Sequence, residues 1–91
     1  MRSKDTTTEK ILEFYNGFKE STEEVQKAMY RTAIESLLWM LGNKNLSYLE
    51  QIMNAGGRET DEPFITYMDA FERAGNLEVF CVDYDKIKQM L

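Results

Sequence analysis

Two carboxylates near the end of the chain have the spacing of a metal-binding pair. Asp83 and Asp85 flank Tyr84, and residues two apart lie on the same side of an extended chain. Carboxylate oxygens are the ligands that Mg²⁺ and Ca²⁺ prefer. A calcium loop also needs further oxygen ligands and a glycine at set positions, and the sequence around Asp83 lacks them. We therefore expect no metal site here, and we interpret Asp83 or Asp85 as the cap of a last helical turn.

The residue types that most enzymes use are scarce. The chain has no histidine and one cysteine, Cys81. Ser–His–Asp and Cys–His catalysis are therefore excluded, and a structural zinc site cannot be assembled. Tyr67, Asp69 and Glu72 form a conceivable acid–base set, but any acidic helix contains such combinations. We expect a protein that is not an enzyme, with no catalytic residues and no cofactor.

Length and charge narrow the class further. The 91 residues carry 16 acidic and 11 basic side chains, a net charge of −5. A chain this short buries only about 60–65% of its unfolded surface, which favours one helical domain over residues 1–91 without a deep cleft. Negative charge opposes direct binding to nucleic acid and to anionic membranes. A lone cysteine indicates a reducing compartment, so we expect a cytoplasmic protein.

The spacing of apolar residues is helical along most of the chain. It predicts helices over about 7–20, 21–41, 47–55 and 63–74, and a short last helix towards Leu91. Three pairs have the spacing of a capping box: Thr6 with Glu9, Ser21 with Glu24, and Ser47 with Glu50. Gly17 marks a site of close packing or a loss of about 1 kcal/mol relative to alanine. The expected fold is all-α or mostly α, a small bundle of four to five helices.

Residues 77–82, LEVFCV, are ambiguous. They are rich in residues that favour strands, and we favour one short strand at 77–82. A single strand cannot satisfy its own backbone groups, so its partner would lie in a second subunit or another protein. A helical conformation would remove that difficulty and stays open as the alternative.

The second helix has more apolar surface than one packing face needs. Its broad stripe includes Val25, Met29, Ile34 and Leu38, and its last turn, 37–41, is apolar in all directions. Such a turn is either wrapped by other helices or part of an interface. Aromatic residues and methionine are enriched at interfaces. Packing between copies of the chain is the preferred use of four such residues: Trp39, Met40, Tyr48 and Tyr67.

Charged residues supply two more candidates for binding. The last third of the chain holds most of the net negative charge, and we expect six of its acidic side chains to face a partner: Asp61, Glu62, Asp69, Glu72, Asp83 and Asp85. Lys27 and Arg31 lie one helical turn apart, near Tyr30, where a small anionic ligand could bind. We favour the simpler interpretation that these cations pair with Glu24 or Glu35.

These features favour a small acidic interaction protein, without catalytic activity, that binds another protein. In size and charge, though in no motif, the chain is similar to phage- or plasmid-encoded inhibitors of host nucleic-acid-handling or defence systems, including anti-restriction and anti-CRISPR proteins. The expected partner is then another protein, for example one that binds nucleic acid, with homo-oligomers as a further form. The alternative is an oligomer that binds a small nucleotide-like ligand between subunits.

Overall fold

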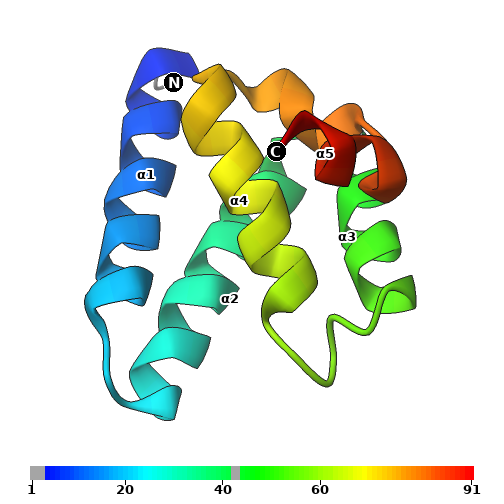
Figure 1. Cartoon of the computed structure of the whole chain (residues 1–91). Coiled ribbons are helices and arrows are strands. Elements are labelled where there is room, and N and C mark those ends of the chain that lie inside the picture. Colours follow the sequence, from blue (N-terminus) through cyan, green and yellow to red (C-terminus); the bar gives the residue numbers. More distant parts are fainter. Residues whose placement is uncertain (1–3, 42–43) are drawn as a thin grey trace. The chain divides into compact units, whose positions relative to one another are not determined.

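The structure is a computed structural model that describes residues 4–41 and 44–91. Five α-helices and one 3-10 helix follow one another (Figure 1): α1 (Lys4–Glu20), α2 (Glu24–Met40), α3 (Lys44–Asn54), α4 (Glu62–Ala74), η1 (Leu77–Cys81) and α5 (Tyr84–Met90). All regular structure in these residues is helical, which confirms the all-α prediction. None of these helices has both the length and the apolar character needed to cross a membrane.

The chain divides into two compact units, Met1–Met40 and Leu41–Leu91. We call them the N-terminal unit and the C-terminal unit. The N-terminal unit holds α1 and α2, and the C-terminal unit holds the other elements. That residues 1–91 form a single domain stays a prediction.

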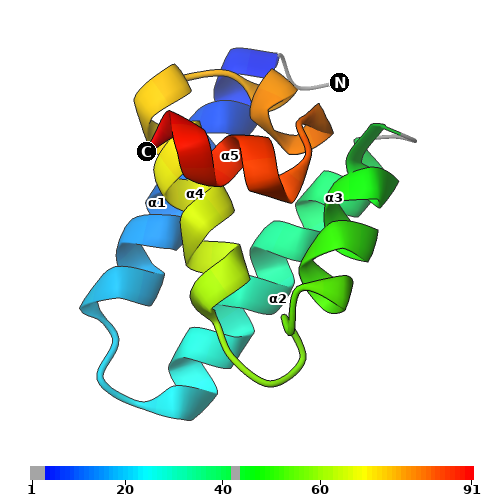
Figure 2. The ribbon, with the colours of Figure 1, turned by 45° about the vertical axis from the view of Figure 1, so that its right-hand side comes forward.

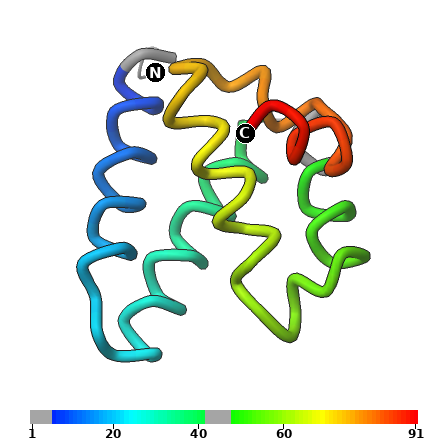
Figure 3. The backbone as a smooth tube through the Cα atoms, viewed as in Figure 1, coloured from blue at the N-terminus to red at the C-terminus, as the bar shows by residue number. Residues whose placement is uncertain are grey.

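The N-terminal unit is an antiparallel helical hairpin, visible in the trace of Figure 3. On α1 the buried residues Ile11, Tyr15 and Phe18 are spaced by four and three, so they share one face of the helix. Gly17 lies against the Tyr30 side chain of α2. A β-carbon at this position would come within 2.6 Å of two carbons of the Tyr30 ring. The expected close packing at Gly17 is confirmed.

Substitution of Gly17 tests this contact. Alanine in place of glycine inside a helix adds about 1 kcal/mol of stability, but here its methyl group meets the Tyr30 ring. We expect Gly17→Ala to stabilise a Tyr30→Ala protein by about 1 kcal/mol and the wild type by much less, or to destabilise it. Urea unfolding of the four proteins of this cycle measures the coupling. Equal effects of Gly17→Ala in both backgrounds would contradict the contact.

The C-terminal unit is built around aromatic side chains. Here α4 packs against η1 and α5, and α3 packs against the same two elements (Figure 2). Tyr48, Tyr67, Phe71 and Phe80 are fully buried, and the Phe80 ring lies 5.0 Å from Tyr48 and 5.1 Å from Phe71 between centroids. The α3, α4 and η1 elements thus share one aromatic core.

Several helix ends in the C-terminal unit lie at residues that commonly begin or end helices. Pro63 lies in the first turn of α4, and Gly75 ends that helix in the left-handed conformation, with φ of 70°. Its N–H donates to the Phe71 carbonyl oxygen at 2.9 Å, the bond that such an end requires. Asp83 is the N-cap residue of α5, as predicted, although its side chain makes no capping hydrogen bond.

The predicted capping boxes are wrong. Because α1 begins at Lys4 and α3 at Lys44, Thr6 and Ser47 lie inside helices rather than before them. The Ser21 hydroxyl donates to the Gly17 carbonyl oxygen at 2.8 Å, so it satisfies the end of α1 instead of the start of α2. The second helix is predicted to end at residue 41, before Gly42 and Asn43, and these two residues lie outside the described ones.

The favoured strand at 77–82 is also wrong, because η1 covers Leu77–Cys81. Local hydrogen bonds satisfy its ends: the Asn76 side chain accepts from the Glu78 N–H at 2.9 Å, and the Val82 N–H donates to the Val79 carbonyl oxygen at 3.1 Å. Val79 and Phe80 are both buried. Adjacent residues of a strand point to opposite faces, whereas the tighter helical turn lets both reach one core.

Candidate functional site

The four aromatic and methionine candidates divide between surface and core. Trp39 and Met40 are 62% and 74% exposed, in agreement with their predicted location at the surface. Tyr48 and Tyr67 are 0% exposed, so their predicted role in an interface is wrong. Their rings meet edge to face, with centroids 4.8 Å apart, and both pack near Phe80 in the aromatic core.

The six acidic residues predicted to face a partner do not all lie on one helix. Glu62, Asp69 and Glu72 share one face of α4, since they are spaced by seven and three. Asp61 precedes that helix, whereas Asp83 and Asp85 lie at the start of α5. In the described part of the chain, no group of three or more His, Cys, Asp or Glu side chains is arranged to hold a metal ion.

Among the large apolar side chains of the described residues, the four most exposed lie on α2. Val25 and Met29 are 71% and 67% exposed, and with Trp39 and Met40 they lie on the side of the helix opposite Ile34 and Leu38. We call this side the outer face of α2. It consists of the exposed residues Val25, Ala28, Met29, Thr32, Ser36, Trp39 and Met40.

The sequence pattern does not separate the outer face of α2 from its buried side. Val25 and Met29 belong to the same broad apolar stripe as Ile34 and Leu38, and only the latter two are buried. A stripe that extends around most of a helix cannot pack on a single neighbouring element. The width of the stripe is the signal that could have separated an inner from an outer side.

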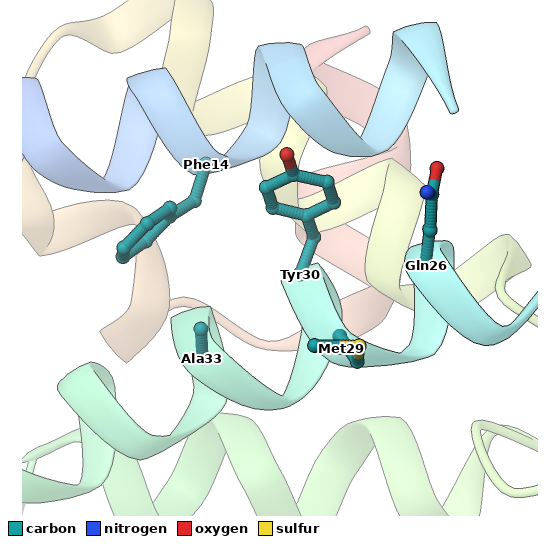
Figure 4. Close-up of a pocket in the computed structure, with 5 residues that line it drawn as sticks. All are labelled: Phe14, Gln26, Met29, Tyr30 and Ala33. Atoms are coloured by element: carbon teal, nitrogen blue, oxygen red, sulfur yellow. The ribbon is translucent and has the colours of Figure 1, made fainter.

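Two hollows lie on the N-terminal unit, one at the edge of the outer face and one on it. The first is about 430 Å³ and is lined by Phe14, Gln26, Met29, Tyr30 and Ala33 (Figure 4). In Figure 4, Phe14 extends from α1 and Tyr30 from α2, with Ala33 below them. The second is about 530 Å³, and five residues of α2 line it: Val25, Ala28, Met29, Thr32 and Ala33. Met29 and Ala33 line both hollows.

Charged side chains of both signs lie along this hairpin. Glu20, Glu23 and Glu24 are exposed around the turn that joins α1 to α2. Arg31 Nε lies 2.7 Å from Glu35 Oε1, which confirms the predicted ion pair for this residue. Lys27 Nζ lies 5.9 Å from the centre of the Phe18 ring. Lys19 is also exposed beside this turn, and its Nζ lies 4.8 Å from the centre of the Tyr15 ring, so the turn carries charges of both signs.

A third hollow, of about 410 Å³, lies on the C-terminal unit and is lined by Gln51, Asn54, Ala55, Asp83, Tyr84 and Asp85. It gathers both residues of the predicted carboxylate pair. Lys88 Nζ lies 3.6 Å from Asp85 Oδ1 and 4.8 Å from the centre of the Tyr84 ring. Asp85 is therefore neutralised from within its own helix, as expected for an ordinary helical ion pair.

A buried hydrogen-bond network adjoins this hollow. The Tyr67 hydroxyl lies 2.6 Å from the Val82 carbonyl oxygen and 3.0 Å from Gln51 Oε1. Gln51 Oε1 also accepts from the Tyr84 N–H. Burial raises the pKa of Tyr67 to about 12, with smaller contributions from Asp83 and Tyr84. The network connects α3, α4 and the start of α5 through one phenol that stays protonated.

Comparison with known proteins finds no relative of this chain. No protein-family model matches the chain, and neither a curated protein nor a solved structure is significantly similar to it.

Proposed function

We propose that this chain is a non-catalytic interaction protein that binds another protein through the outer face of α2. The observation that carries the proposal is the exposure of four large apolar side chains on this one helix: Val25, Met29, Trp39 and Met40. Large apolar side chains that gather on a surface mark interaction sites, whereas scattered ones need no explanation. Tryptophan is also among the residues that dominate binding energy at interfaces.

Charge favours a different protein, rather than a second copy of this chain, as the partner. The seven residues of the outer face include no charged side chain, so two copies of this face have no opposite charges to pair. A symmetric dimer would bring these faces together, each from a chain with a net charge of −5. A partner with a basic surface gains attraction instead. A protein that handles nucleic acid has such a surface, which is consistent with an inhibitor of the phage or plasmid type.

Exchange of one methionine tests the role of the outer face. Met29→Lys places a charge where Met29 lines both hollows, while lysine keeps a high helix propensity. We expect partner retention on the immobilised protein to fall at least about 30-fold, the effect of losing a residue that contributes about 2 kcal/mol. The measurement is quantitative mass spectrometry of proteins captured from the native host lysate, followed by titration with the purified partner.

Met90→Lys is the matched control. Met90 is 50% exposed on α5, so the same change is made on a different surface. Circular dichroism should show that both variants keep their helical content. Capture of the same proteins in the same amounts by both variants would contradict the proposed function.

A further inference from the structure

The methionine side chains of the described residues range from open surface to core. Met29 and Met40 are the most exposed, at 67% and 74%, and both belong to the outer face of α2. Met53 on α3 and Met90 on α5 are 38% and 50% exposed, whereas Met68 on α4 is 0% exposed. The same thioether is therefore presented to solvent to very different extents within one chain.

The two most exposed methionines lie on one side of one helix. Met29 and Met40 are 11 residues apart, which is three helical turns to within about 20° and about 16 Å along the axis. The outer face that they share includes no charged side chain, and Met29 also lines both hollows. A change of polarity at these two sulfur atoms would therefore alter much of the apolar surface on which the proposed function depends.

An exposed thioether has a defined reaction with hydrogen peroxide. A lone pair of the methionine Sδ attacks one peroxide oxygen, an S–O bond forms as the O–O bond breaks, and the other oxygen leaves as water. Sulfur loses two electrons and peroxide gains them. The product, methionine sulfoxide, is polar where methionine is apolar, and sulfoxide reductases reverse the change.

Oxidation would act on binding through the solvation of the new oxygen. On the free protein, water surrounds an exposed sulfoxide and satisfies its oxygen. A partner that covers Met29 and Met40 must remove that water, which weakens binding about 10-fold or more where no hydrogen bond replaces it. Sulfoxide formation disrupts interfaces that are rich in methionine for this reason.

We propose that Met29 and Met40 form a peroxide-sensitive modification site, at which oxidation to the sulfoxide releases the partner and reduction restores binding. This inference rests on the proposed function and adds its regulation. The fold stays intact during the reaction, because the buried Met68 is shielded from the oxidant.

Limited oxidation with hydrogen peroxide provides the test. Every protein carries Cys81→Ser, because the exposed thiol of Cys81 also reacts with peroxide. Peptide mapping by mass spectrometry measures the sulfoxide at each methionine, and circular dichroism measures helical content. We expect Met29 and Met40 to react first, and Met68 at least about 10-fold more slowly, since it reacts only when the fold opens. Helical content should not change.

Partner retention on the immobilised protein is measured before and after oxidation, and each protein is compared with its own untreated sample. We expect retention by the Cys81→Ser protein to fall at least about 10-fold. Methionine sulfoxide reductase should restore it.

Leucine variants assign the effect to the two sulfur atoms. Met29→Leu with Met40→Leu keeps two apolar side chains of similar volume but removes both thioethers, so peroxide should leave its retention as it was before treatment. Met53→Leu with Met90→Leu is the matched control, and its retention should fall as far as that of the Cys81→Ser protein. Both variants keep Trp39, so oxidation of the indole cannot produce a difference between them.

Three results would overturn the inference: equal losses of retention in the two leucine variants, oxidation of Met29 and Met40 without loss of retention, and oxidation of Met68 as fast as that of Met29. If retention still fell in Met29→Lys in any of these cases, the proposed function would stand alone. Retention that ignored both Met29→Lys and peroxide would overturn the proposed function and this inference with it.

Discussion

Replacement of Phe80 by alanine should lower the free energy of unfolding of the C-terminal unit by about 3–5 kcal/mol. Phe80 is 0% exposed, and its ring packs on Tyr48 and Phe71 at centroid distances of 5.0 and 5.1 Å. Removal of the ring leaves a cavity bordered by elements from three parts of the chain. The whole free energy of unfolding of a small domain is about 5–15 kcal/mol, so the variant should be close to unfolding at room temperature.

Urea unfolding followed by circular dichroism measures this effect, and amide exchange over residues 62–90 assigns it to the unit. Ile65→Ala is the control, because Ile65 is exposed on α4 and its loss should cost less than about 1 kcal/mol. Phe80→Leu should fall between the two. A loss below about 1 kcal/mol for Phe80→Ala would mean that η1 does not hold the aromatic core together.

The position of Phe80 also shows why the tail was mispredicted. The sequence around it is rich in valine and aromatic residues, which favour strands on average. Strand propensity reflects packing on a sheet, and no strand is present in the described residues to receive it. The bond from the Glu78 N–H to the Asn76 side chain instead starts a tight helical turn. Asparagine is a favoured N-cap residue, so Asn76 indicates a helical start, whereas the composition of the residues after it favours a strand.

Helix interiors were predictable, whereas helix starts were not. The spacing of Ile11, Tyr15 and Phe18 indicates a helical face without further information, and all three are buried. Ser21 and Glu24 have the spacing of a capping box at the start of α2. The Ser21 hydroxyl nevertheless donates to the Gly17 carbonyl oxygen at the end of α1. A serine between two helices can satisfy either one, and its backbone conformation decides which. Spacing alone carries no such information.

The candidate surface was predictable in part. Trp39 and Met40 follow from a turn that is apolar on all sides, because one neighbour cannot cover every side of a helix. Tyr48 and Tyr67 have equally suitable side chains for an interface, but they meet Phe80, which is distant in sequence. Which aromatic residues face outward depends on such long-range packing. Composition therefore indicates that a surface is present, and the tertiary structure selects its residues.

The buried phenol of Tyr67 should make the protein sensitive to alkaline pH. Its pKa is raised to about 12, chiefly by burial, whereas an unfolded tyrosine has a pKa of about 10. Below pH 10 both states hold the proton, and its contribution to stability is complete. Between about pH 10 and pH 12 the unfolded chain releases the proton and the folded chain keeps it, so stability falls by up to about 3 kcal/mol.

Tyr67→Phe separates this effect from the titration of other groups. The variant loses the one proton that the hydroxyl shares between the Val82 carbonyl oxygen and Gln51 Oε1, so we expect it to be about 1–2 kcal/mol less stable than the wild type at pH 8. Because phenylalanine has no proton to release, that difference should shrink above pH 10 and reverse near pH 12. Urea unfolding at intervals of pH measures both curves, and the other tyrosines contribute equally to each. Curves that stay parallel from pH 8 to pH 12 would show that the Tyr67 hydroxyl titrates alike in both states and is not held by this network.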